Sequence, residues 1–213
     1  MQMYRKMIVG AIALATVLTA VPAFAQNQPS SGLGFGVHFG GAWTSARTEE
    51  DFEVDTSAGA GWLAGIWFGG NRDGRVGLMG ELSYLKSKIK VDDFGDELVS
   101  ERTFIQIPVL LRINAGSRSR AGASVYFLVG PAFDIQLDAD DDFTDFFGDA
   151  DDVYEGLNIG IMGGVGFEAA RLGIEFRYNY GLRSVLATDS AVAEGFGSVK
   201  TNQIQLVGKI RIN

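Results

Sequence analysis

Eight segments of this chain alternate apolar and polar residues with a period of two, which is the pattern of a β-strand. In the clearest segment, Ile174 and Phe176 share one face while Glu175 and Arg177 share the other. No segment has a convincing helical stripe. The eight segments lie at about 33–44, 58–69, 75–87, 102–113, 122–136, 156–168, 171–183 and 202–212. The sequence therefore predicts an all-β fold with strands of about 10–13 residues, longer than the usual five or six.

The connections between these segments alternate between short and long. The short ones, rich in Gly, Asn and Ser, are turn-like and lie at 69–74, 114–120 and 169–170. The long ones contain 21 of the 26 acidic residues and lie at 45–57, 88–101, 137–155 and 184–201. An even number of strands, with short turns at one end and long loops at the other, predicts an eight-stranded antiparallel up-and-down transmembrane β-barrel.

The alternation alone does not tell whether the apolar face lines a soluble, lipocalin-like core or contacts lipid. The polar face favours lipid contact, because it is rich in glycine, which suits a crowded lumen better than a solvent-exposed strand. Placing Arg177 or Lys209 in lipid would also cost about 2–4 kcal/mol each near the midplane. The aromatic residues predicted to face lipid are Phe35, Trp43, Trp62, Phe68, Tyr84, Phe133, Phe167, Tyr178 and Tyr180.

The polar face is predicted to form a network that fills the lumen. Its members are His38, Glu81, Gln106, Arg112, Glu168, Glu175, Arg177, Lys209 and Arg211. His38 is the only histidine, so a histidine metal cluster cannot form, and we expect this residue to make lumenal hydrogen bonds. No set of a nucleophile and a base is recognisable, so we predict no enzymatic activity, no catalytic residue and no cofactor.

Residues 1–25 have the order of features of a cleaved signal peptide. Two basic residues precede a 15-residue apolar run, which is shorter than the roughly 20 residues that a transmembrane helix needs. Ala23 and Ala25 then form a small-x-small site before Gln26, where we expect cleavage. The mature chain, 26–213, is predicted to be one domain that works outside the cytoplasm.

Composition excludes several classes of protein. The chain has no cysteine, which rules out a disulfide framework, a zinc-thiolate site and an acylated lipoprotein anchor. Its net charge of −8 argues against nucleic acid as a partner, because an acidic protein and a nucleic acid repel each other. No apolar run of 18 residues follows the signal segment, so we do not expect a helical membrane protein.

The most acidic stretch, at 137–155, is a candidate surface for a cation or a partner. Carboxylates are the hard oxygen ligands that calcium and magnesium take, but the glycine and glutamate of an EF-hand loop are missing. A solvated, self-repelling loop is the simpler interpretation. Aromatic residues within the stretch favour packing over the barrel mouth or contact with a partner. The candidate residues are Asp138, Asp140, Asp142, Asp145 and Asp149.

Three stretches add a resemblance to these patterns: IQIPVLLR at 105–112, VGP at 129–131 and FRYNYGL at 176–182. With them, the mature chain resembles the family of small outer-membrane β-barrel domains of Gram-negative bacteria. The resemblance implies an eight-stranded barrel in outer-membrane lipid, inserted from the periplasm by the assembly machinery. It implies no single activity, because members range from structural proteins to adhesins.

We therefore expect a monomeric outer-membrane barrel with a side-chain-filled lumen and acidic extracellular loops. Its expected role is structural or surface-interactive, such as adhesion or envelope maintenance. Two alternatives remain open. A narrow passive pore for small solutes would require a continuous water path through the lumen. A secreted soluble carrier would require the apolar face to line a ligand cavity.

Overall fold

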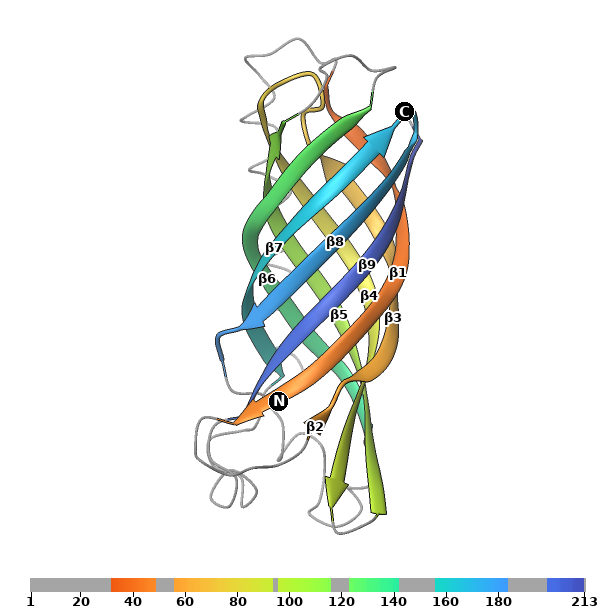
Figure 1. Ribbon diagram of the computed structural model, residues 1–213, viewed down its shortest axis with the longest axis vertical. Coiled ribbons are helices and arrows are strands. Elements are labelled where there is room, and N and C mark those ends of the chain that lie inside the picture. The colour runs from red at the N-terminus through yellow and green to blue at the C-terminus, as the bar shows by residue number, and fades with distance from the viewer. Residues whose placement is uncertain are drawn as a thin grey trace, which may run out of the picture.

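A computed structural model describes residues 32–48, 56–93, 96–115, 123–141, 156–183 and 199–212, which form an antiparallel barrel (Figure 1). Its strands are β1 (Gly34–Thr48), β2 (Thr56–Ser57), β3 (Gly59–Gly69), β4 (Val76–Asp93), β5 (Asp96–Asn114), β6 (Ser124–Asp141), β7 (Leu157–Ala169), β8 (Leu172–Gly181) and β9 (Val199–Arg211). Within the described residues, no helix is long and apolar enough to cross a membrane.

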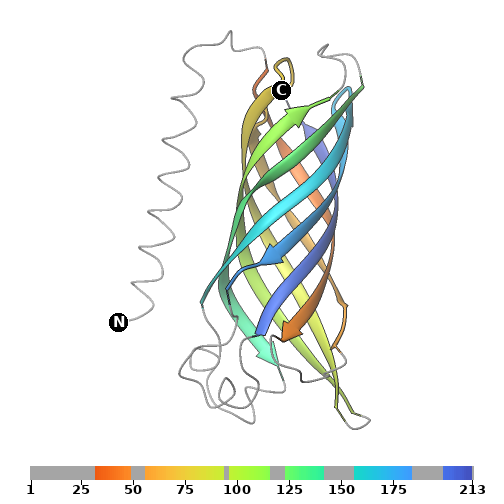
Figure 2. The same cartoon turned by 60° about the vertical axis from the view of Figure 1, so that its left-hand side comes forward.

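The sheet closes on itself. β1 pairs with β3 on one side and with β9 on the other, and every further pairing in the ring is antiparallel between strands adjacent in sequence. The short β2 pairs with β4, as β3 does, so β2 and β3 share one position in the ring. The described strands therefore form the eight-position up-and-down barrel that the alternation predicts, and its strands run obliquely around the axis (Figure 2).

The side-chain alternation follows the predicted faces. On β8, Ile174 and Phe176 are each 51% exposed, whereas Glu175 and Arg177 are 1% and 0% exposed. Of the nine aromatic residues predicted to face lipid, eight are exposed and Phe133 is partly buried. A continuous apolar outer surface of this extent is unstable in water but suits a barrel surrounded by lipid.

The β4–β5 hairpin is longer than the sequence pattern predicts. These strands stay paired as far as Asp93 and Asp96, so most of 88–101 is a hairpin rather than the expected long loop. Figure 1 shows the hairpin projecting beyond the rest of the barrel. Acidic residues interrupt the apolar pattern here, but the backbone hydrogen bonds of an antiparallel ladder form regardless of side chain.

The acidic candidates divide between described and undescribed residues. β6 continues to Asp141, so Asp138 and Asp140 lie on a strand rather than in a loop. The candidates Asp142, Asp145 and Asp149 lie outside the described residues. The expected cleavage site at Ala23, Ala25 and Gln26 also lies outside them.

Candidate functional site

Four buried charged side chains meet inside the lumen, and we call them the four-charge cluster: Glu81, Glu175, Arg177 and Lys209. Arg177 donates from Nη1 and Nη2 to the two oxygens of Glu81, at 2.8 and 2.7 Å, and from Nε to Glu175 at 2.7 Å. The Lys209 ammonium lies 2.9 Å from Glu81 and 3.1 Å from Glu175. Two cations thus balance two carboxylates, as buried charges require.

Tyr126 and His38 complete this cluster. The Tyr126 hydroxyl donates to Glu175 Oε1 at 2.5 Å. His38 Nε2 shares a hydrogen bond of 2.8 Å with the Ser83 hydroxyl and lies 4.0 Å from Glu81 Oε2. Both side chains therefore contact charged or polar neighbours, and His38 lies between a serine hydroxyl and a carboxylate.

A second group, which we call the arginine cluster, surrounds Glu168 near the β7–β8 turn. Arg112 donates to Glu168 Oε2 at 2.8 Å, while Arg211 and Arg72 approach Oε1 to 3.2 and 3.4 Å. The Arg112 guanidinium also lies 3.7 Å above the Tyr126 ring centroid, within range of a cation–π contact. Three arginines thus share one carboxylate.

Sequence reasoning missed Arg72. This residue belongs to the turn between β3 and β4, and its side chain donates to the Ala170 carbonyl at 2.8 Å in another turn. Alternation identifies lumenal residues only within strands, so a turn residue that folds back into the lumen gives no such signal.

Amides and hydroxyls form a third lumenal group. Gln106 donates to Asp134 at 2.8 Å and accepts from Gln205 at 2.9 Å. Farther along the lumen, Gln203 donates to the Thr44 hydroxyl at 3.0 Å. Of these residues, only Gln106 was among the predicted network, although alternation also places Gln203 and Gln205 on the polar face.

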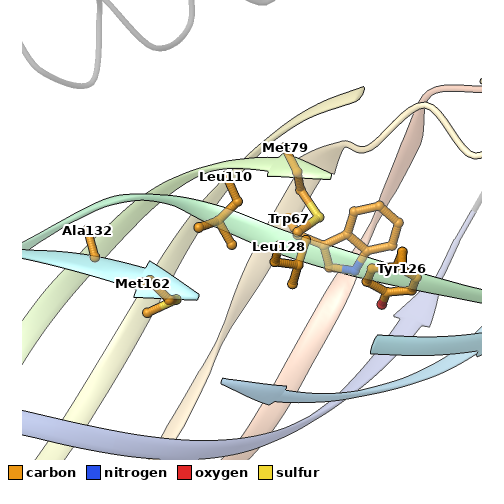
Figure 3. Packing of buried hydrophobic residues seen from close by; sticks show 7 residues of the cluster. All are labelled: Trp67, Met79, Leu110, Tyr126, Leu128, Ala132 and Met162. Carbon is orange, nitrogen blue, oxygen red and sulfur yellow. The ribbon is translucent and has the colours of Figure 1, made fainter. Parts of the chain in front are cut away.

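Apolar side chains fill much of the remaining lumen, which the sequence reasoning did not anticipate. One buried cluster, shown in Figure 3, comprises Trp67, Met79, Leu110, Tyr126, Leu128, Ala132 and Met162. A second comprises Ala42, Leu63, Leu85 and Val207. Large residues on the nominally polar face therefore occupy space that an open channel would need.

A comparison with protein families decides what kind of barrel this is. Residues 24–187 match the family described as outer membrane protein beta-barrel domain. The chain belongs to this family. As a member, it is a bacterial outer-membrane protein, and its exposed apolar face contacts lipid. This placement removes the alternative of a secreted soluble carrier.

Solved structures of outer-membrane proteins are similar to this member of the family. Ail of Yersinia pestis is 14% identical, with 85% of this chain and 99% of that chain covered and a TM-score of 0.47. Neisserial surface protein A is 14% identical, with coverages of 85% and 100% and a TM-score of 0.47. OprG from Pseudomonas aeruginosa is 14% identical, with coverages of 84% and 94% and a TM-score of 0.43. Among curated proteins, none matches.

In this family member, the nine residues of the predicted network are all buried, with exposed fractions of 9% or less. Their contacts divide them among the three groups described above. Within the described ranges, no three His, Cys, Asp or Glu side chains are arranged to hold a metal ion.

Proposed function

We propose that this protein is a surface-interaction protein whose loop end, rather than its lumen, carries the function. We define the loop end as the end of the barrel at which β1, β4, β6 and β8 finish, and the opposite end as the turn end. The observation that carries the proposal is the filled lumen. A continuous water path through the lumen would require breaking the contacts of Arg177 with Glu81 and Glu175. It would also require displacing buried apolar side chains of the lumen.

The loop end faces the cell exterior in this proposal, because outer-membrane barrels place their short turns in the periplasm and their longer loops outside. The four regions at this end, 45–57, 88–101, 137–155 and 184–201, contain 21 of the 26 acidic residues. The basic residues in the same regions are Arg47, Lys88, Lys90 and Lys200. The loop end is therefore strongly acidic.

An acidic surface of this kind selects a partner of opposite charge. We propose a basic protein segment as the partner class. The β4–β5 hairpin supports an interaction role, because its paired strands hold backbone beyond the barrel rather than leaving it as an unstructured connection. Ion pairs from Lys86 and Lys88 to Glu101 lie along its sides.

The test measures binding of polylysine, as a basic probe, to the refolded barrel in lipid nanodiscs. The charge-removing variant combines Asp142→Asn, Asp145→Asn and Asp149→Asn, and the matched control combines Glu substitutions at the same positions. We expect the Asn variant to bind more weakly, with less dependence on salt, and the Glu control to bind like the wild type. Equal binding by all three proteins would overturn the proposed surface.

A planar-bilayer recording separates this role from that of a narrow passive pore. Because the lumen is filled, we expect the wild-type barrel to leave conductance at the level of the bare bilayer. Steady unitary conductance from the intact wild-type protein would favour the pore and overturn the argument from the filled lumen.

A further inference from the structure

A small cavity lies at the turn end of the lumen, beside the arginine cluster. The centre of a water-sized sphere can occupy about 10 Å³ of it, so it holds a single small molecule or ion. Arg112, Lys209 and Arg211 line it together with Arg171 from the β7–β8 turn, and Glu168 is the one carboxylate in its lining. The rings of Trp67 and Tyr126 also contribute to the lining.

The charges that the described residues place around this cavity do not balance. Lys209 belongs to the four-charge cluster, in which two cations face two carboxylates. By contrast, Arg112 and Arg211 both pair with Glu168, so these two arginines keep an excess of positive charge among the described residues. Buried cations in excess of their partners are costly, which makes the site attractive to an anion.

Several donors at the cavity are unused. Arg112 is 1% exposed, and its Nη2 has no hydrogen-bond partner among the described residues, although Nη1 donates to Glu168. Nε of Arg211 and the indole Nε1 of Trp67 are also buried, and the described part of the chain offers neither a hydrogen-bond acceptor. Native proteins rarely leave such donors unmatched, so each one indicates an additional acceptor.

From these three observations, we propose that the turn-end cavity binds a small inorganic anion of the size of chloride. A cavity of this size excludes a phosphate or a carboxylate-bearing metabolite, so a monatomic ion is the class of anion that is left. The anion would accept hydrogen bonds from Arg112, Arg211 and Trp67 and would balance the charge that Glu168 leaves uncompensated. This site is independent of the loop end and of its proposed partner.

Gly173 offers a variant that fills the cavity without disturbing its walls. A Cβ at this position would lie 3.5 Å from the Phe167 carbonyl oxygen, 3.6 Å from Lys209 Cβ and 3.7 Å from the Tyr126 hydroxyl, which are ordinary contacts. Gly173→Ala therefore keeps every cavity donor and removes space. Gly208→Ala is the matched control, because its Cβ would lie 3.6 Å from the Phe39 ring, on the outer face of the neighbouring strand β9.

The first experiment follows thermal unfolding of the detergent-refolded barrel as chloride replaces gluconate at constant ionic strength. An anion that binds only the folded state raises Tm with its concentration. We expect a saturable rise in Tm for the wild type and for Gly208→Ala, and none for Gly173→Ala. A wild-type Tm that does not depend on chloride, or a Gly173→Ala variant that keeps the dependence, would overturn the proposal.

The second experiment locates the anion directly. Crystals of the wild type soaked in bromide are expected to give an anomalous peak beside Arg112 and Arg211. Absence of that peak would mean that only water occupies the cavity, and the proposal would be wrong. If Gly173→Ala fails to fold, Arg211→Gln replaces it, because this variant removes unused donors and is expected to lower the chloride dependence.

Discussion

Arg177 and Glu81 join opposite parts of the barrel through two parallel hydrogen bonds, although 96 residues separate them in sequence. Arg177 lies on β8 and Glu81 on β4, and these strands do not pair with each other. The planar guanidinium matches both carboxylate oxygens at once, a geometry that lysine does not offer. The contact therefore braces the barrel across its lumen, in addition to the backbone ladders around its wall.

Replacing Arg177 with methionine is expected to destabilise the barrel strongly. The change leaves Glu81 and Glu175 buried with only Lys209 between them, and losing one partner of a buried ion pair costs about 3–5 kcal/mol. Urea unfolding in detergent measures this loss, and the folded fraction should still reach the membrane. Lys88→Met is the control: its ion pair is exposed, so its effect should stay within about 1 kcal/mol. Equal effects of the two variants would contradict the bracing role.

Gly166→Ala tests how tightly the lumen is packed. A Cβ at this position would lie 2.3 Å from ring atoms of Tyr126, so the ring must shift and its hydrogen bond to Glu175 must weaken. Such overpacking costs about 1–3 kcal/mol. Gly163→Ala, on the same strand, would meet only the Leu128 carbonyl, at 3.9 Å, and should be nearly neutral. Chemical unfolding of both variants measures whether the lumen accommodates the extra methyl group, in which case the two variants would be equally stable.

A charge placed on the outer face tests the contact with lipid. Phe176 lies mid-strand on β8 and is 51% exposed, so Phe176→Arg should cost about 2–4 kcal/mol, as it does near a bilayer midplane. Leu182 follows the last residue of β8, and Leu182→Arg should cost only about 0–1 kcal/mol. The readout is the fraction of protein that migrates as a heat-sensitive, SDS-resistant band. A similar loss of the folded band in both variants would argue against placing Phe176 deeper in the bilayer than Leu182.

The hairpin ion pairs should contribute to stability only above acidic pH. Hydrogen bonds from Lys86 and Lys88 lower the pKa of Glu101 below its ordinary value of 4.5. A carboxyl whose pKa falls on folding stabilises the native state above its unfolded pKa, and this contribution disappears as the pH drops through the folded pKa. The difference in unfolding free energy between wild type and Glu101→Gln should therefore be small but measurable at pH 7. This difference in unfolding free energy should vanish on acidification. A difference that grows in acid would contradict a lowered pKa of Glu101 in the folded state.

The sequence predicts the barrel well because period-two alternation follows directly from strand geometry. On β8, the large apolar side chains lie outside and the charged ones inside, so a slip of one residue would reverse both faces. The lengths of the strands at the loop end could not be predicted in this way. Between Ile89 and Glu101, backbone pairing continues where the side-chain pattern does not mark it.

The lumenal site is predictable only in part. Alternation identifies which side of a strand Arg177 or Glu168 occupies, but not which carboxylate a given arginine reaches across the lumen. That choice depends on the stagger between strands, as the contact of Arg177 with Glu81 illustrates. Arg72 escaped prediction because it lies in a turn, and Met79 and Leu110 because an apolar residue on a polar face is an exception to the pattern.

The junction between β1 and β9 also has a consequence for the order of folding. This junction brings together strands from opposite ends of the described chain, and the hydrogen bond from Gln203 to Thr44 spans 159 residues. Contacts of such sequence separation form late, because most of the chain must be ordered before they can be made. The pairing of β1 with β9, which closes the ring, is therefore expected to form last. Earlier species on the folding pathway would then have two unpaired strand edges exposed to the membrane and to other chains.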